Sequence, residues 1–506
     1  MGKRINFIDC TLRDGHQSLL ATRMSAEQAQ RVLPLIRDCG FSILELWGGA
    51  ILDASLRFTN DDPFERLDGL RKTLGEGVAI RSLCRGQNLF GYTPYPDNLV
   101  FEFIKEAVRS GNDRVRIFDA LNDHRNLQTA LMSVKTFNGH AEAALSYTTS
   151  PVHDLNHFMR FAETVVDNGA DSLAIKDMAG LLHPVDCFEL VDAMRERFPG
   201  VEISLHSHCT NGLACASYIA GMLAGVDNLD TGFGPMAGVT AQPPIELMSW
   251  FARAAGYETN VDLANASKID SGLREIRKEL SDVDRYPDQY GDPWPQEPSA
   301  EAMRLVQEAL ELIGSREREN IDKAIEIIED RILVDMQNYP PVDRTQLEAQ
   351  IPGGMLSNLH NQMKEQGRLD ILPQVLDEVP KVRAEAGYVP LVTPTSQIVG
   401  SQAAMNVLMG ERYKMMSNEF RNLVLGKYGR LPGPADPEVI RKASPDGEVF
   451  TKRPGDYAEP IDLNQLGGDT AEFVKTRRDA LLYLLFAGPA KGFLTKRKEA
   501  KVRVPA

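Results

Sequence analysis

Residues 172–208, SLAIKDMAGLLHPVDCFELVDAMRERFPGVEISLHSH, contain one full repeat of the pattern that decides the fold. The repeat opens with the apolar run 172–176, continues through a segment of helical periodicity and closes with a second apolar run that ends at His208. Short apolar runs of this kind indicate buried strands, and two of them joined by a helix indicate parallel strands. Both runs end in residues that can do chemistry, such as Lys176 and His206.

The same repeat extends through the first half of the chain. Eight short apolar runs alternate with helical patterns, and eight strand and helix units in succession close into a parallel (β/α)8 TIM barrel. The fold class predicted is therefore α/β. The eight runs are 5–9, 42–47, 79–84, 114–118, 143–147, 172–176, 202–208 and 228–231.

The ends of these runs predict where an active site would lie. In such barrels, loops at the carboxyl ends of the strands bring together residues from distant parts of the sequence. The residues of catalytic type at these ends are Asp14, Arg85, Asp119, Lys176, His206 and His208. This layout predicts an enzyme.

The overall composition narrows the class of protein further. The chain has 506 residues, and a barrel uses about 250, so further domains are expected. Acidic residues outnumber basic ones by 71 to 56, and the net charge of -15 opposes general binding to nucleic acid. Six cysteines without a Cys-x-x-Cys pair are typical of buried thiols in a reducing compartment. Because neither a signal-peptide pattern nor a long apolar run occurs, we expect a cytoplasmic protein.

Breaks in the periodic patterns predict the domain boundaries. Four prolines and a glycine between residues 286 and 298 mark the end of the barrel. The amphipathic patterns 299–313 and 320–333, with Ser299 as N-cap, predict a helical hairpin. The expected plan is a barrel domain at 1–285, a helical hairpin insertion at 286–340, a mainly α-helical C-terminal domain at 341–490 and a basic tail at 491–506.

Two histidines on one strand are the strongest candidate for a metal site. Side chains two apart in a strand point to the same face, so His206 and His208 can reach one point at the barrel mouth. Asp14 could add a carboxylate oxygen, although hydrogen-bonded barrel histidines without a metal are the alternative. Lys176 could serve as a ligand only as a neutral amine or a carbamate, and an ion pair with Asp177 or a neighbouring acid is its alternative role.

Six motifs, which occur in order over most of residues 4–490, resemble one enzyme family. They are RDGHQSLLATR at 13–23, WGGA at 47–50, RGQN at 85–88, IKDMAG at 175–180, PGGMLSN at 352–358 and VTPTS at 392–396. The family is that of the biotin-dependent carboxyltransferases acting on pyruvate and oxaloacetate. It includes the carboxyltransferase part of pyruvate carboxylase, the alpha subunit of oxaloacetate decarboxylase and the pyruvate-side subunit of transcarboxylase.

The resemblance implies a metal centre and a pyruvate site in the barrel mouth. The ion would be zinc, cobalt or manganese, and its ligands would be Asp14, carbamylated Lys176, His206 and His208. Pyruvate would be held by Gln17 and Arg85, because a guanidinium group donates two parallel hydrogen bonds to a carboxylate.

The resemblance also implies a biotin site that the C-terminal domain completes. Asp53, Tyr92 and Ser396 match positions that contact biotin. Thr393 matches the residue that relays a proton between the methyl group of pyruvate and the ureido nitrogen of biotin. The domain at 341–490 would then cap the barrel mouth. The catalytic residues expected are Thr393, Lys176 and Arg85.

The carboxyl donor is expected on another polypeptide, since the chain has no Ala-Met-Lys-Met turn to carry biotin. A biotin carboxyl carrier protein or another biotinylated subunit is the partner implied, with a biotin carboxylase or membrane decarboxylase subunits beyond it. The resemblance also implies a homodimer. ATP use would belong to a partner, because no Gly-rich phosphate loop occurs.

Four positions depart from the family pattern and bear on substrate choice. Gly15 stands where alanine is usual, Ile51 replaces threonine, Cys84 replaces leucine, and the segment 231–235 is unusual. Two other functions remain as alternatives. One is a metal-dependent aldol or Claisen-type lyase or synthase, which shares the Arg-Asp-Gly start and the His-x-His strand. The other is a non-enzymatic scaffold that binds a biotin carrier.

Overall fold

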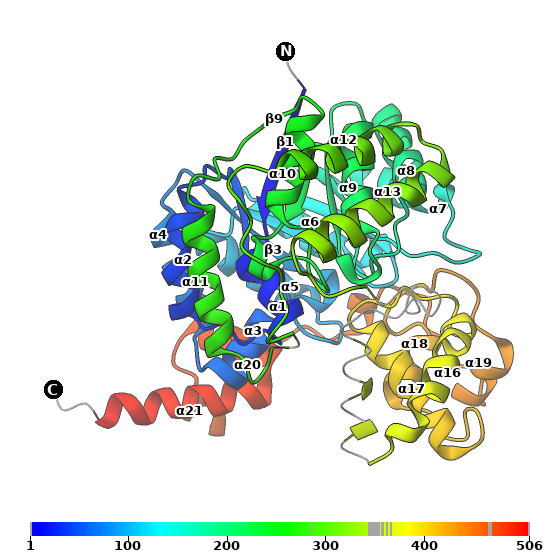
Figure 1. Cartoon of the computed structure of the whole chain (residues 1–506). Coiled ribbons are helices and arrows are strands. Elements are labelled where there is room, and N and C mark those ends of the chain that lie inside the picture. The colour runs from blue at the N-terminus through cyan, green and yellow to red at the C-terminus, as the bar shows by residue number, and fades with distance from the viewer. Residues whose placement is uncertain are drawn as a thin grey trace.

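The computed structural model of the protein describes residues 3–284, 286–342, 355, 359–360, 363–364, 367–463 and 468–503. Eight parallel strands pair in chain order, and the eighth pairs with the first, so that the sheet closes into a barrel (Figure 1). The predicted α/β barrel is therefore confirmed. The strands are β1 (Arg4–Asp9), β2 (Ile43–Gly48), β3 (Ala79–Cys84), β4 (Arg114–Phe118), β5 (His140–Ser146), β6 (Ser172–Asp177), β7 (Glu202–Ser207) and β8 (Asn228–Thr231).

Helices follow the strands and form the outer layer of the barrel. Their apolar faces pack on the strands, which read as nearly continuous apolar runs because both faces of the sheet are buried. A short strand, β9 (Glu258–Thr259), pairs with the start of β1. The helices are α2 (Ala26–Arg37), α4 (Pro63–Leu74), α5 (Asp97–Arg109), α6 (Gln128–Thr136), α7 (Leu155–Asp167), α8 (Pro184–Arg197), α9 (Ala214–Ala224), α10 (Ile245–Ala254) and α11 (Ala266–Glu279).

Short helical turns at the carboxyl ends of the first two strands carry much of the first two motifs. Because these turns follow β1 and β2 directly, their residues lie at one end of the barrel. They are η1 (Thr11–Gly15) and α1 (His16–Leu19) after β1, and α3 (Ile51–Ala54) and η2 (Ser55–Thr59) after β2.

The segment expected as a helical hairpin lies against the barrel. Ser299 caps its first helix, because its side chain accepts a hydrogen bond from the backbone of Ala302. Ile313, Ile321 and Ile328 are fully buried in the same apolar core as the barrel. These helices pack on α8, α9 and α10. The elements are α12 (Ala300–Gly314), α13 (Arg318–Glu326) and η7 (Ile327–Met336).

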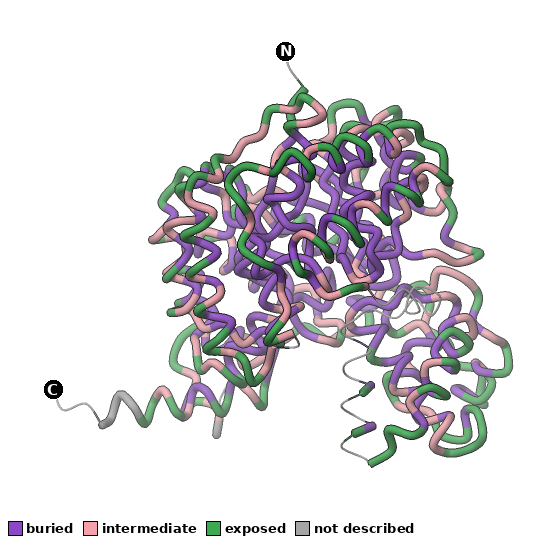
Figure 2. The backbone as a smooth tube through the Cα atoms, viewed as in Figure 1, coloured by how far each residue is buried: buried purple, intermediate pink, exposed green. Residues whose placement is uncertain are grey.

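A second, smaller apolar core belongs to the helical C-terminal part, as Figure 2 shows by its separate buried centre. The mainly α-helical character predicted for this part is confirmed. Of the motif at 352–358, only Met355 lies within the described residues. The helices are α16 (Leu372–Glu385), α17 (Thr395–Met409), α18 (Asn418–Val424) and α19 (Pro437–Ala443).

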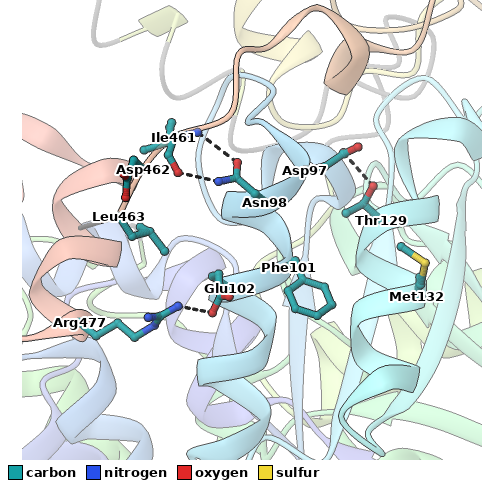
Figure 3. Close-up of a pocket in the computed structure, with 10 residues that line it drawn as sticks. All are labelled: Asp97, Asn98, Phe101, Glu102, Thr129, Met132, Ile461, Asp462, Leu463 and Arg477. Carbon is teal, nitrogen blue, oxygen red and sulfur yellow. Dashed lines mark hydrogen bonds and ion pairs between the residues drawn. The ribbon is translucent and has the colours of Figure 1, made fainter. Parts of the chain in front are cut away.

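The chain then returns to the barrel and crosses α5 and α6 (Figure 3). Asn98 on α5 donates to the carbonyl of Ile461 at 2.6 Å, and Arg477 forms an ion pair with Glu102. The last helices are α20 (Arg477–Leu485) and α21 (Ala487–Arg503).

The basic tail expected at 491–506 is helical as far as Arg503. Buried Phe493 and Leu494 give this helix an apolar face, which packs on α20 and η2. Residues 504–506 lie outside the described part of the chain. Among the helices that the structure describes, none is long and apolar enough to cross a membrane.

Candidate active site

Asp14, His206 and His208 meet at the carboxyl end of the barrel. His206 Nε2 lies 3.1 Å and His208 Nε2 lies 3.4 Å from Asp14 Oδ2, and the two imidazole Nε2 atoms are 3.3 Å apart. The alternation of side chains along a strand brings the two imidazoles to one face, and η1 carries Asp14 toward them. All three side chains are buried, and their ligand atoms lie close enough together to hold one metal ion.

Lys176 lies beside this cluster on the neighbouring strand. It is paired in register with His206, and its Nζ is 3.1 Å from His206 Nε2. The alternative ion pair with Asp177 does not form, because that carboxylate accepts hydrogen bonds from the backbone of Leu181 and Leu182 instead. Burial lowers the pKa of Lys176 to about 8, although the negative charge of Asp14 opposes this effect. A neutral amine is therefore accessible at mildly alkaline pH.

The outer nitrogens of both imidazoles are held by fixed partners. His206 Nδ1 lies 2.8 Å from Asp230 Oδ2, and His208 Nδ1 lies 2.7 Å from the carbonyl oxygen of Thr240. Burial opposes the ionisation of Asp230, but Arg116 and Arg81 hold its pKa well below the usual value. Since an ionised carboxylate and a carbonyl can only accept, both Nδ1 atoms carry the hydrogen.

The inner atoms of the cluster are therefore all hydrogen-bond acceptors. The Nε2 atoms of His206 and His208 present lone pairs, as does the carboxylate of Asp14. Despite burial, the positive charge of Arg13 holds the pKa of Asp14 well below its usual value, so this group carries a negative charge. Acceptors this close repel one another unless a donor or a cation lies between them. Two imidazoles and one carboxylate form a set of metal ligands that fits a divalent cation.

A layer of buried charges lies next to the cluster inside the barrel. Arg81 donates to Glu45 at 2.8 Å and to Asp230 at 2.7 Å, and Arg116 donates to Glu142 at 2.7 Å. None of these five side chains is exposed. The sequence interpretation missed them, because each is an isolated charge within an apolar run. The useful signal is that helices cover the outside of the strands, so a charged strand residue must face the interior.

The two residues expected to hold pyruvate follow different strands. Arg85 directly follows β3 and is buried, and its Nη1 donates to the carbonyl of Phe90 at 2.7 Å. Gln17 lies on α1, where its Oε1 accepts the N–H of Ala50 at 3.0 Å. Gly49 has a φ of +56°, which favours glycine, and a side chain at this position would come within 2.6 Å of Gln17 Oε1. The first and second motifs therefore fit against each other.

Two of the three residues expected to contact biotin lie together. Tyr92 Oη donates to Asp53 Oδ2 at 3.4 Å, and Arg57 forms an ion pair of 2.6 Å with the same carboxylate. The Arg85 guanidinium lies 5.5 Å from the ring of Tyr92. The structure thus brings the expected biotin residues of the barrel next to one expected pyruvate residue.

A residue of the C-terminal part, Arg453, helps to hold the loop that carries Arg85 and Tyr92. Gln87, within this loop, donates to the carbonyl of Tyr95 at 2.6 Å and to Asp97 at 3.0 Å. Arg453 Nη1 donates to the same oxygen of Asp97 at 2.9 Å. A segment far along the sequence therefore holds the base of this loop.

Ser396 lies in the first turn of α17, and Thr393 lies just before this helix, next to the barrel. Val392 packs in one apolar cluster with Leu83 and Phe118 at the strand ends. The Phe118 ring in turn lies 5.8 Å from Lys176 Nζ. Within the described part of the chain, no hydrogen bond or ion pair joins Thr393 or Ser396 to the barrel residues expected to bind substrate. The packing of Val392 is what brings this segment toward the cluster.

Asp119 follows a strand end, but its carboxylate binds the loop that comes after it. Its carboxylate accepts hydrogen bonds from the backbone of Leu121 and Asp123 and from the side chain of Asn126. Asn126 also donates to the carbonyl of Tyr428 at 2.8 Å. Asp119 therefore organises a loop that contacts the helical C-terminal part.

Two departures from the family pattern lie close to the same backbone oxygen, that of Met236. A methyl group at Gly15 would lie 2.7 Å from the backbone oxygen of Met236, which follows the unusual segment 231–235. In that segment, a side chain at Gly232 would lie 2.9 Å from the same oxygen. The backbone at Met236 therefore leaves room for glycine at position 15 but not for a side chain.

Comparison with known proteins covers nearly the whole chain. A family described as "Conserved carboxylase domain" matches residues 347–505, and one described as "HMGL-like" matches residues 98–272. A pyruvate carboxylase subunit from Methanocaldococcus jannaschii is 38% identical over 98% of this chain and 79% of its own length. The methylmalonyl-CoA carboxyltransferase 5S subunit of Propionibacterium freudenreichii subsp. shermanii is 35% identical over 98% of this chain and 88% of its own length.

A solved structure extends the likeness to three dimensions. The carboxyl transferase domain of Rhizobium etli pyruvate carboxylase, solved with pyruvate and biocytin, matches with a TM-score of 0.79 and 28% identity. The match covers 99% of this chain and 79% of that chain. Since fold, motif order and near full-length similarity agree, the chain belongs to the family of biotin-dependent carboxyltransferases that act on pyruvate and oxaloacetate.

Proposed function

We propose that this enzyme moves a carboxyl group between carboxybiotin, carried by a partner protein, and pyruvate, which becomes oxaloacetate. The observation that carries the proposal is the cluster of Asp14, His206 and His208 beside Lys176, with the Arg85 and Tyr92 loop following β3 at the same end of the barrel. The solved relative from Rhizobium etli was crystallised with pyruvate and biocytin, which supports the same pair of ligands.

Asp14, His206 and His208 would hold a zinc, cobalt or manganese ion, with Lys176 as a fourth ligand after conversion to a carbamate. The carbamate forms when the neutral amine attacks carbon dioxide and releases one proton, so the lowered pKa of Lys176 favours it. When bound, the ion would stabilise negative charge on the substrate oxygen as the methyl proton leaves.

The chain's own residues would perform the remaining steps. Arg85 and Gln17 would bind and orient pyruvate, while Asp53, Tyr92 and Ser396 would hold the biotin ring. Thr393 Oγ1 would pass a proton from the methyl group of pyruvate to the ureido nitrogen that becomes basic when carbon dioxide is released. The methylene carbon would then bond to that carbon dioxide. Val392, packed on Leu83 and Phe118, would help to exclude water from the mouth.

The partner in this reaction would be a biotin carboxyl carrier protein or another biotinylated subunit. A biotin carboxylase or membrane decarboxylase subunits would complete the assembly, and the carboxyltransferase itself would be a homodimer. The domain at 341–490 would serve as a cap over the barrel mouth. Affinity purification of the tagged chain from its host, followed by identification of the biotinylated polypeptide, tests the partner assignment.

The reaction itself is tested with free biotin in place of the carrier. The purified chain, supplied with metal and bicarbonate, should release pyruvate from oxaloacetate in a biotin-dependent manner. Thr393→Ala should lower this rate about 10²–10⁴-fold, the usual contribution of a proton-transfer group, without changing the metal content. Thr136→Ala, an exposed threonine on α6, is the control and should keep the full rate. Full activity in Thr393→Ala would rule out the proton relay.

A metal-dependent aldol or Claisen-type reaction is the second candidate. The match of residues 98–272 to the HMGL-like family favours it, because this match covers part of the barrel. Cleavage of a 3-hydroxyacyl thioester in the absence of biotin would support this second candidate over carboxyl transfer.

A further inference from the structure

Gln242 reaches into the cluster of Asp14, His206 and His208. Its Nε2 lies 2.9 Å from Asp14 Oδ2, 3.2 Å from His208 Nε2 and 3.4 Å from His206 Nε2. The side chain is buried, with 1% of the residue exposed. One amide nitrogen therefore faces all three atoms that would hold the ion.

The orientation of this amide follows from its surroundings. Because both imidazoles donate through Nδ1, their Nε2 atoms accept, and the ionised carboxylate of Asp14 also accepts. Only the NH2 end of Gln242 can face three acceptors, since its carbonyl end would add a fourth. An NH2 group has two hydrogens for these three acceptors, and Lys176 Nζ, 3.1 Å from His206 Nε2, can supply the third donor. A cation between the three would satisfy all of them.

The loop that carries Gln242 is attached to both sides of the cluster. Thr240, two residues earlier, accepts from His208 Nδ1 through its carbonyl and donates through Oγ1 to the carbonyl of Ser18 at 3.0 Å. The backbone of Gly238 donates to the carbonyl of Gln242 at 2.8 Å and closes the loop. The loop thus connects the end of β7 with the helix that follows Asp14.

We propose that Gln242 is a positioning residue of the metal centre. Without the ion, its NH2 group holds the carboxylate and the two imidazoles together. With the ion bound, the imidazole lone pairs turn to the ion, and Gln242 continues to donate to Asp14, which has lone pairs to spare. This inference rests on the proposed metal site and adds a residue to it.

The test measures metal binding by the full-length chain rather than its turnover. Co²⁺ affinity is determined by competition with a chelator, and the visible absorption of bound Co²⁺ reports the arrangement of its ligands. Gln242→Met keeps the volume and removes the donor, and should weaken Co²⁺ binding about 10–100-fold, as is usual when an outer partner of a ligand is lost. Its Co²⁺ spectrum should also differ from that of the wild type.

Two further variants make the result interpretable. Gln402→Met removes a buried amide from the helical C-terminal part, where it donates to Asn406 and Met415, and should leave Co²⁺ binding unchanged. Gln242→Asn keeps a polar amide but withdraws it from Asp14, so it should also weaken Co²⁺ binding. This variant provides the test if Gln242→Met does not fold.

The outcomes separate this inference from the proposed function. If both Gln242 variants fold and bind Co²⁺ with the affinity and the visible spectrum of the wild type, Gln242 is not a positioning residue. The proposed metal site would not be affected by that result. A wild-type chain that binds no Co²⁺ in the presence of bicarbonate would overturn both.

Discussion

The substitution Asp230→Asn tests how the buried charge layer supports the histidine cluster. Asp230 Oδ2 accepts from His206 Nδ1 at 2.8 Å and from Arg81 at 2.7 Å, and Arg116 donates to the same oxygen. None of these side chains is exposed. Asparagine has nearly the same shape, but its neutral amide leaves the two guanidinium groups with one negative charge fewer.

The size of the effect follows from this burial. Removing one partner of a buried ion pair costs about 3–5 kcal/mol, because the remaining charge is left without compensation. Glu45 and Glu142 still face the two arginines, so we expect the lower end of this range, about 3 kcal/mol of the free energy of unfolding. The affinity for the ion should also fall about 10–100-fold, because an outer partner of His206 is altered.

Urea unfolding of the metal-free chain and a chelator competition measure these two effects. Asp335→Asn is the matched control, since that carboxylate is 64% exposed and lies 3.5 Å from Arg331. Such a surface pair contributes about 0–1 kcal/mol. If Asp230→Asn unfolds at the same urea concentration as the wild type and binds the ion equally tightly, the reasoning is wrong.

Three further predictions concern pH, packing and the substrate loop. Burial raises the pKa of Glu246 from 4.5 to about 8, so the folded chain holds this proton more tightly than the unfolded chain and loses stability as pH rises between these values. Glu246→Gln should reduce that loss by up to about 1.4 kcal/mol per pH unit in urea unfolding at acid and alkaline pH, and an unchanged slope would contradict this. Gly15→Ala should lower the free energy of unfolding by about 1–3 kcal/mol, because the methyl group meets the Met236 oxygen at 2.7 Å; unchanged thermal stability would show that the loop yields. Arg453→Met removes the charged hydrogen bonds to Asp97 and should raise the KM for free biotin roughly tenfold with kcat little changed, whereas an unchanged KM would refute the link to the loop.

The barrel could be predicted from the sequence because the pattern repeats eight times. The strands 79–84, 114–118 and 228–231 have the predicted bounds, and the others differ by one to three residues at one or both ends. Apolar strands enclosed by amphipathic helices leave few other arrangements. The grouping of His206 with His208 also followed from strand alternation alone.

The surroundings of the cluster could not be read from the sequence in the same way. Gln242 and Thr240 lie in a loop without periodicity, and their contacts depend on the path of the backbone between β8 and α10. Asp230 is a lone charge in a short apolar run, so its hydrogen bond to His206 becomes visible only when the barrel closes. The helix at residues 487–503 was missed because its basic residues outweigh its narrow apolar face.

The central claim is that one divalent ion lies among Asp14, His206 and His208, with Lys176 beside it. Anomalous diffraction at the cobalt absorption edge, from crystals of the full chain grown with Co²⁺ and bicarbonate, locates such an ion directly. One strong peak is expected within about 2.0–2.2 Å of the Asp14 oxygen and both Nε2 atoms, with extra density on Lys176 Nζ. A peak elsewhere in the barrel, or no peak in crystals that contain ample Co²⁺, would contradict it.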